Sequence, residues 1–160
     1  MSLSQILLPE FDVELAKTRE ALEKIPPERF EWAPQEDSMS LGDLATHLAN
    51  IPNWGHLVLE APSFDLEPSG GESTQIDRAA DLAETLLRFD AAVARARAAI
   101  ECTDDDRWQE EWSLLNSGEV VFSLPRAVVV RRMVMNHLIH HRGQLVVYLR
   151  LVGAPIPRIY

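Results

Sequence analysis

Residues 125–152 decide the fold, and they read PRAVVVRRMVMNHLIHHRGQLVVYLRLV. Pro125 suits the first turn of a helix, because its ring fixes φ at a helical value and its missing N–H has no partner there anyway. Apolar residues then recur at helical spacing as far as Val152, where Gly153 and Pro155 end the pattern. The stretch therefore predicts one helix of about 27 residues.

Three of the five histidines of the chain lie in this helix, at positions 137, 140 and 141. At about 100° per residue, His137 and His141 are separated by about 40° around the helix axis and about 6 Å along it. Both rings can therefore reach one ion. His140 is rotated by about 100° from His141, so it is expected to point away from that ion.

His47 is the candidate for a third ligand, because a catalytic metal site usually takes ligands from more than one element. It lies between Leu44 and Ile51 on the apolar face of an earlier predicted helix, where an unpaired ring would cost free energy. Neutral imidazole suits Zn, Ni and Fe, and three such ligands leave positions open for water or substrate. The alternative for His47 is a hydrogen-bonded core histidine, and surface or outer-sphere roles are expected of His56 and His140.

Two further helices are predicted before the loop in the middle of the chain. Apolar residues from Leu8 to Ile25 recur at spacings of three and four, with Ser4 as the N-cap and Pro26 beyond the end. Residues 40–43, SLGD, form a capping box that begins the next helix, and Pro52 is expected to kink it.

The remainder of the chain supplies one more helix and one ambiguous segment. Thr74 and Asp77 carry a second capping signature, which predicts a helix that runs to about Glu101. Around residues 116–118, NSG, a small hairpin and an irregular loop are both compatible with the pattern. Four helices with one buried stripe each predict an all-α four-helix bundle, and residues 1–160 have the size of a single domain.

Composition narrows the range of partners. Fifteen Lys and Arg against 25 Asp and Glu give a net charge of −10, which repels phosphate backbones and anionic lipids. Neither nucleic acid nor a membrane is therefore expected as a partner. The first residues lack the pattern of a signal peptide, and no apolar run approaches the roughly 20 residues of a membrane span, so a cytoplasmic location is expected.

Residues beside the histidine cluster suggest supporting roles. Gly143 within a helix is unfavourable by up to about 1 kcal/mol relative to Ala, which predicts close approach of another helix. Arg142 is expected to pair with a carboxylate such as Asp43, and Arg142 or Gln144 to orient the ligands. Ordinary packing and a surface salt bridge are the alternative.

The tryptophans and the single cysteine indicate a functional role less clearly than the histidines do. Trp54, Trp108 and Trp112 are candidates for lining a pocket near the metal, with core packing as the alternative use. Cys102 precedes three aspartates, whose charge disfavours a thiolate, so an inert thiol is expected.

Residues 44–49, LATHLA, residues 136–145, NHLIHHRGQL, and residues 148–150, YLR, resemble the DinB/YfiT-like family. The similarity covers nearly the whole chain. It implies a four-helix bundle of up-down-down-up connectivity, often a homodimer, with a divalent metal held by one histidine of the second helix and a His-x-x-x-His pair of the last. Carried over, these ligands are His47, His137 and His141.

Activity follows from the resemblance less directly. Characterised members include transferases and isomerases that use a low-molecular-weight thiol, which implies a metal-dependent thiol S-transferase acting on a small electrophilic substrate. A non-catalytic metal- or ligand-binding stress-associated module and a metal-dependent hydrolase are the alternatives, and a purely structural bundle with stacked histidines is a third. The sequence offers no carboxylate general base beside the histidine motif, which disfavours the hydrolase.

Overall fold

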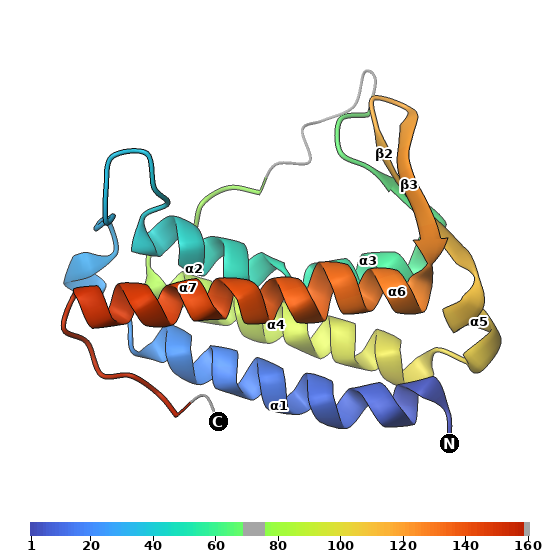
Figure 1. Cartoon of the computed structure of the whole chain (residues 1–160), viewed down its shortest axis with the longest axis horizontal. Helices are drawn as coiled ribbons and strands as arrows, with labels where there is room; N and C mark the ends of the chain where they lie inside the picture. Colours follow the sequence, from blue (N-terminus) through green and yellow to red (C-terminus); the bar gives the residue numbers. More distant parts are fainter. Residues whose placement is uncertain (69–75, 159–160) are drawn as a thin grey trace.

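The computed structural model describes residues 1–68 and 76–158, which form a mostly helical protein with a small sheet (Figure 1). The helices are α1 (Leu3–Glu23), η1 (Pro27–Arg29), α2 (Leu41–Asn50), α3 (Asn53–Glu60), α4 (Leu82–Cys102), α5 (Asp105–Gln109), α6 (Arg126–Val130), η2 (Arg131–Asn136) and α7 (His137–Leu151). The strands are β1 (Ser63–Asp65), β2 (Glu111–Asn116) and β3 (Glu119–Pro125).

The long helical segments lie side by side and enclose the core. α4 packs against α1, α2 and α3, and α7 packs against α1 and α2. In Figure 1, α1 and the α6–α7 segment run in one direction, whereas α2, α3 and α4 run in the other. The interior between them contains fully buried side chains from every long segment, including Phe11, Leu48, Phe89 and Leu145.

Residues 126–151 form one continuous helical segment, as the sequence predicted, but with a change of helix type inside it. α6 and α7 are α-helical, whereas η2 between them is π-helical. A π-helical turn replaces i→i+4 hydrogen bonds by i→i+5 bonds, and such turns are frequent at functional sites. η2 ends directly before His137.

The predicted start of α2 at the Ser40 capping box is confirmed, and the helix is interrupted at Pro52, where a kink was predicted. The Ser40 side chain accepts from the N–H of Asp43, and the Asp43 side chain accepts from the N–H of Ser40. Pro52 lies between α2 and α3, where it divides the predicted kinked helix into two. This cap fixes the position of α2, on which His47 lies.

Two predicted helix starts are wrong. Ser2 caps α1, and the buried Ser4 instead donates to the carbonyl of Thr103 and accepts from Nε1 of Trp108. α4 begins at Leu82 with Asp81 as its N-cap, so Asp77 precedes the helix, and Thr74 lies outside the described residues. Several Ser, Thr and Asp residues compete for each cap, and packing decides among them.

The all-α expectation is wrong in one respect, because the chain also forms a three-stranded sheet in the order β1-β2-β3. β2 and β3 pair antiparallel as a hairpin, and Ser117 and Gly118 in its turn have φ angles of 53° and 84°. β1 pairs parallel to β2. The Asp65 carboxylate at the end of β1 accepts hydrogen bonds from the N–H groups of Ser117 and Gly118, which attaches β1 to the turn.

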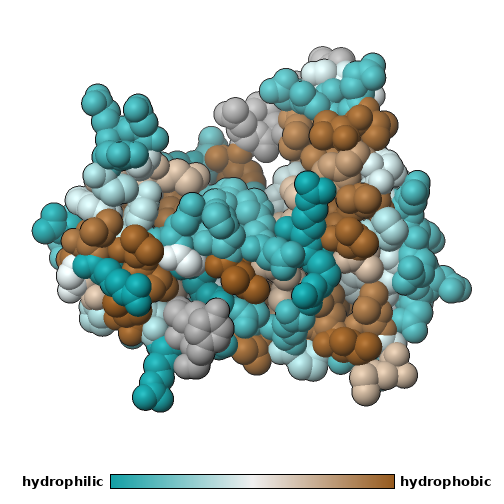
Figure 2. Space-filling model, viewed as in Figure 1, coloured by the Kyte–Doolittle hydropathy of each residue, from teal (hydrophilic) through white to brown (hydrophobic). Residues whose placement is uncertain are grey.

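Hydrophobic side chains reach the surface at both ends of the face shown in Figure 2. They gather over the hairpin and α6 at one end and near the end of α7 at the other, with a hydrophilic band between them. Val120, Val128 and Leu151 are 61%, 46% and 61% exposed. Among the described residues, no helix has both the length and the apolar character that a membrane span needs.

Candidate metal centre

His47, His137 and His141 lie together at the contact between α2 and α7. Each of the three rings offers one nitrogen to a group of atoms that all lie within 4.8 Å of one another. Nε2 of His47 is 3.1 Å from Nε2 of His137, and the His47 and His141 ring centroids are 4.4 Å apart. Three residues that are up to 94 positions apart in the sequence, 141 against 47, thus converge.

Helical spacing and packing explain this convergence. His137 and His141 are one turn apart on α7, so their rings project from the same face of the helix. On α2, the buried residues Leu44 and Leu48 flank His47 and hold that face of the helix against the core. The contact between α2 and α7 therefore turns the histidines toward one another.

Hydrogen bonds from their second ring nitrogens also orient His137 and His141. Nδ1 of His141 lies 2.6 Å from Oε1 of Gln144, which can only accept, so Nδ1 carries the proton and Nε2 keeps its lone pair. The ring of His137 donates to the carbonyl of Met133, and its Nε2 faces His47, so Nδ1 is again the donor. Such hydrogen bonds orient metal-ligating histidines and raise the basicity of the other nitrogen. The predicted orienting role of Gln144 has a geometric basis.

The backbone N–H of His137 does not use the Met133 carbonyl. In a regular α-helix the backbone N–H of His137 would donate to the carbonyl of Met133, four residues earlier. Here that N–H donates to the carbonyl of Val134 instead. The Met133 carbonyl can therefore accept a hydrogen bond from the His137 imidazole. The residue types in η2 gave no indication of this hydrogen bond in the sequence.

Electrostatics keep the three rings neutral. Burial, with the neighbouring His141 and His137, lowers the pKa of His47 from 6.5 to about 4. Burial also lowers the pKa of His137 and of His141, although their hydrogen bonds to Met133 and Gln144 act in the opposite direction. Because a metal needs the neutral ring, the site already has the required protonation state at neutral pH.

The remaining histidines lie outside the cluster. His140 is exposed and does not belong to the group of three ligand atoms, although its ring meets that of His141 edge to face with centroids 4.9 Å apart. His56 on α3 lies 3.0 Å from a Glu60 carboxylate oxygen. In the described part of the chain, no Cys, Asp or Glu joins the three histidines.

Arg142 does not pair with Asp43, and this prediction is wrong. Its side chain is 2% exposed and points to α1, where Nη2 donates to Glu14 Oε2 at 2.5 Å and Nη1 donates to the Glu14 carbonyl at 3.0 Å. One position beyond His141, the helix has turned by about 100°, away from α2. Arg142 therefore joins α7 to α1.

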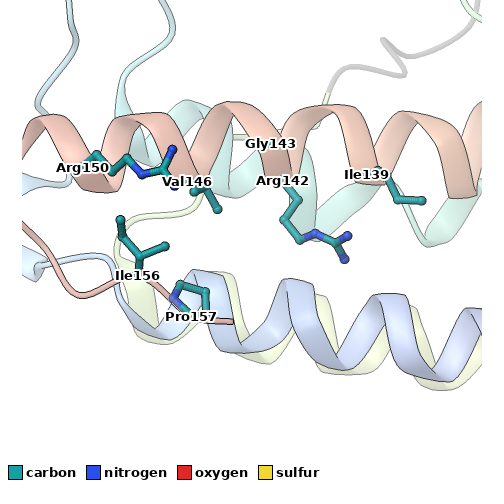
Figure 3. A pocket seen from close by; sticks show the side chains of 7 residues that line it. All are labelled: Ile139, Arg142, Gly143, Val146, Arg150, Ile156 and Pro157. Atoms are coloured by element: carbon teal, nitrogen blue, oxygen red, sulfur yellow. The ribbon is translucent and has the colours of Figure 1, made fainter. Parts of the chain in front are cut away.

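Gly143 does not mark a close helix contact either. A Cβ at this position would have no neighbour within 4 Å. The residue instead borders a cavity of about 420 Å³ between α7 and residues Ile156 and Pro157, on the α1 side of α7 (Figure 3). The packing that the sequence predicted at this glycine is thus absent.

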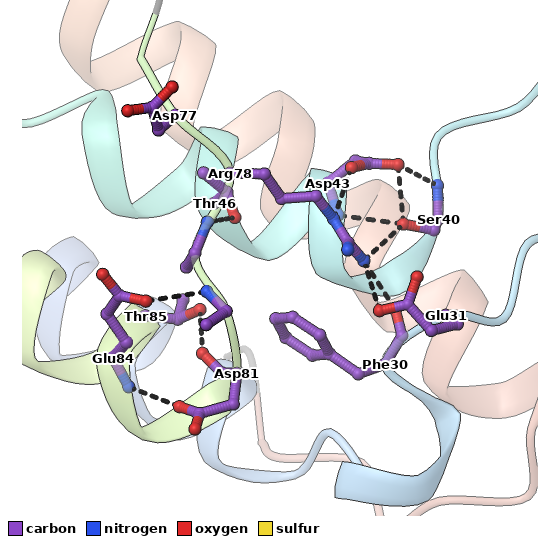
Figure 4. Close-up of polar contacts among 12 residues, drawn as sticks. Phe30, Glu31, Ser40, Asp43, Thr46, Asp77, Arg78, Asp81, Glu84 and Thr85 are labelled. Atoms are coloured by element: carbon purple, nitrogen blue, oxygen red, sulfur yellow. Dashed lines mark hydrogen bonds and ion pairs between the residues drawn. The ribbon is translucent and has the colours of Figure 1, made fainter.

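Asp43 instead belongs to a network that closes one side of a cavity next to His47. The cavity measures about 340 Å³ and is lined by Asp43, Thr46, His47, Asn50, Trp54, Ile76 and Arg78. Arg78 Nε lies 2.7 Å from Asp43 Oδ1, and Ser40 Oγ lies 2.6 Å from Asp43 Oδ2 (Figure 4). Burial raises the pKa of Asp43, but the hydrogen bonds from Ser40 and the charge of Arg78 outweigh it and lower that pKa overall. Asp43 is thus an ionised, fully engaged carboxylate.

The tryptophans divide between the cavity and the core. Trp54 lines the cavity beside His47, as one of the two interpretations predicted. Trp108 and Trp112 are fully buried core residues, so for them the packing alternative is correct.

Fold and site together define a mostly helical protein in which three histidines from two helices lie close enough to hold a metal ion. The DinB family model matches residues 1–160, and the chain belongs to the DinB family. A comparison with curated proteins gave no match.

Two crystal structures of DinB-like proteins share the fold. The protein from Bacillus cereus is 17% identical with a TM-score of 0.73, and the alignment covers 99% of this chain and 98% of that one. The protein from Bacillus subtilis is 20% identical with a TM-score of 0.69, and the alignment covers 94% of each chain. At these identities the likeness concerns the fold alone.

Proposed function

We propose that this protein is a metal-dependent enzyme in which His47, His137 and His141 hold one divalent ion. The observation that carries the proposal is the convergence of three ring nitrogens within 4.8 Å, with two of the rings oriented by Gln144 and Met133. A core histidine needs one hydrogen-bond partner, whereas three ring nitrogens gathered this closely suit a shared ligand.

The donor set fits Zn, Ni or Fe, because neutral imidazole is a good ligand for all three. Three protein ligands would leave further coordination positions for a thiol or water, and one of these ligands, His47, also lines a cavity. An ion bound there would lower the pKa of a thiol or water that it coordinates, which supplies a nucleophile at neutral pH.

The chain's own residues favour an external thiol over an internal nucleophile or base. Asp43 lines the cavity but is engaged by Ser40 and Arg78, so it does not serve as a general base. Cys102 is an exposed residue at the end of α4 and does not belong to the histidine group. We therefore infer a thiol S-transferase that joins a low-molecular-weight thiol to a small electrophilic substrate.

The remaining parts of the proposal concern architecture and assembly. The helix directions in Figure 1 support an up-down-down-up four-helix bundle formed by a single domain. A homodimer would cover the exposed apolar side chains at one or both ends of the face in Figure 2. We propose a cytoplasmic location, with no nucleic acid or membrane partner, because the net charge is −10.

The experiment that tests this function combines metal analysis with a thiol-conjugation assay. Purified protein is expected to contain about one divalent ion per chain. With an activated aryl halide and a panel of small thiols that includes cysteine and glutathione, the sulfur would form the new C–S bond while halide leaves and the thiol proton passes to solvent. Turnover should vanish with a chelator and in His47→Ala, and should be unchanged in Cys102→Ser.

Other outcomes would replace the proposal. Stoichiometric metal without turnover would indicate a binding module, and hydrolysis that needs no thiol would indicate a hydrolase. If the purified protein contains no metal after growth with Zn, Ni or Fe, the histidines have a structural role and the proposed function is wrong.

A further inference from the structure

Three adjoining cavities form one cleft beside α2, α3 and α4. The first, of about 340 Å³, contains His47; the second and third, of about 450 and 390 Å³, contain Arg95. Asn50 and Ile76 line all three, so the cavities are neighbours and not separate sites. We call this space the Asn50 cleft.

Arg95, Asn53 and Asn50 form a chain of hydrogen bonds at the Arg95 end of this cleft. Nη2 of Arg95 donates to Oδ1 of Asn53 at 2.7 Å, and Nδ2 of Asn53 donates to Oδ1 of Asn50 at 2.8 Å. A guanidinium can only donate, so Arg95 fixes the orientation of Asn53, and Asn53 fixes that of Asn50. The end of this relay is the NH₂ group of Asn50, at the residue that all three cavities share.

Arg95 also differs in charge balance from the other arginines of the cleft. Arg78 pairs with Asp43 and Glu31, and Arg88 pairs with Glu84. Within residues 1–68 and 76–158, no carboxylate pairs with Arg95. In the same part of the chain, the NH₂ group of Asn50 donates no hydrogen bond to a protein acceptor. Among the described residues, Arg95 is therefore a positive charge of the cleft without a carboxylate partner, in a protein that is acidic overall.

The neighbouring wall of the cleft is apolar. Trp54 and Phe64 meet edge to face, with ring centroids 5.2 Å apart, and Leu57 extends this apolar surface in the same cavity as Arg95. An apolar body can lie against these side chains, because aromatic faces contribute large contact areas at little entropic cost.

We propose that the Asn50 cleft binds a small amphipathic carboxylate, with the carboxylate on Arg95 and Asn50 and the apolar body against Trp54 and Phe64. A carboxylate matches this polar wall because it is an acceptor only and fits the planar guanidinium fork. Asn50 and Trp54 line both the Arg95 cavity and the His47 cavity. The far end of such a molecule therefore reaches toward His47.

This inference deepens the proposed function by naming the chemical class of the substrate. To that extent it rests on the proposed function, whereas the binding subsite itself involves no histidine of the metal centre. The two can therefore fail separately.

The test compares two probes that differ only in the head group, 3-phenylpropionate and 3-phenylpropionamide, by ligand-observed NMR titration. The wild-type protein is expected to bind the acid about tenfold more tightly than the amide, because charge-assisted hydrogen bonds form only with the carboxylate. Arg95→Gln should abolish the preference. Trp54→Ala should weaken binding of both probes alike.

Arg97→Gln is the matched control, because Arg97 lies on the same helix but pairs with Asp12 and Glu101. It should retain the full preference for the acid. Equal binding of the two probes by the wild-type protein, or an undiminished preference in Arg95→Gln, would overturn the proposal.

His47→Ala separates this subsite from the metal centre. The preference for the acid should persist in this variant, even though metal binding is lost. A preference that disappears in His47→Ala would place the carboxylate at the histidines and overturn the proposal. A persistent preference in a wild-type protein that never binds metal would instead refute only the proposed function.

Discussion

His141 and Arg142 are neighbours in α7, yet they belong to two polar clusters of opposite kind. Arg142 faces α1, where Glu14 supplies both a carboxylate and a carbonyl oxygen to its terminal nitrogens. His141 faces α2, where its ring meets that of His47, and it also contacts the ring of His137 one turn earlier on α7. One cluster pairs a buried cation with a carboxylate of the protein, and the other gathers three ring nitrogens within 4.8 Å of one another.

The difference separates a polar cluster that supports packing from one that can bind a ligand. A buried charge that faces its counter-charge, as Arg142 faces Glu14, joins two helices within the protein. Three rings whose pKa values are lowered favour the neutral form, which is the form that binds a metal. Each of the following predictions addresses one side of this comparison.

The largest expected effect is loss of metal from the histidine cluster. His137→Ala should abolish stoichiometric metal binding while circular dichroism shows unchanged helical content, because the apolar core supplies most of the folding free energy. His140→Ala should retain the metal. If both variants lose it equally, the ligand assignment within α7 is wrong.

The second effect concerns folding stability on the α1 side. Glu14→Ala should lower the free energy of unfolding by about 3 kcal/mol or more, because it leaves Arg142 buried without a counter-charge. Glu10→Ala, on the same helix, removes the exposed pair with Arg131 and should cost no more than about 1 kcal/mol. Urea denaturation measures both, and equal losses would show that burial does not distinguish these pairs.

A smaller effect is expected from the residue that orients His141. Gln144→Leu should weaken metal binding roughly 10- to 100-fold without loss of fold, because the hydrogen bond to Nδ1 no longer holds the ring. Gln144→Glu retains an acceptor and should restore most of the affinity. Competition with a chromophoric chelator measures the change, and unaltered affinity in the Leu variant would remove Gln144 from the site.

The smallest effect is a pH dependence of the metal-free protein. The pKa of His47 is about 4 in the folded state and ordinarily 6.5. Between these pH values the unfolded chain therefore binds a proton at His47, whereas the folded chain does not. Stability should therefore fall as pH drops from 6.5 toward 4, and should not change through His47 above that range. Urea midpoints between pH 7 and pH 5 should fall less in His47→Ala than in the wild type; an equal fall would exclude His47 as a cause.

Much of the candidate site could be predicted from the sequence, because helical spacing is local. The separation of His137 from His141 fixes their common face, and the apolar neighbours of His47 place it inward. Close approach of α2 to α7 requires long-range packing, and only the structure reports it. The metal itself stays a prediction.

The errors have a common physical origin, since each depends on the rotation of a helix or on a distant partner. Arg142 was expected to reach Asp43, but its position on α7 directs it to α1. β1 escaped prediction because three residues, SFD, form a strand only once the β2–β3 hairpin offers an edge. Gly143 has no close neighbour, so local helix propensity was a poor guide to its environment.

The π-helical turn η2 links the backbone to the histidine cluster. The Met133 carbonyl, whose hydrogen bond raises the pKa of His137, lies inside η2, so opening of this turn is expected to disturb the His137 ring. Amide hydrogen exchange in residues 131–136 should therefore report on the histidines, although none of these residues is a proposed ligand. Metal binding is expected to slow exchange there more than in α1, which would make backbone protection a measure of site occupancy that needs no substrate.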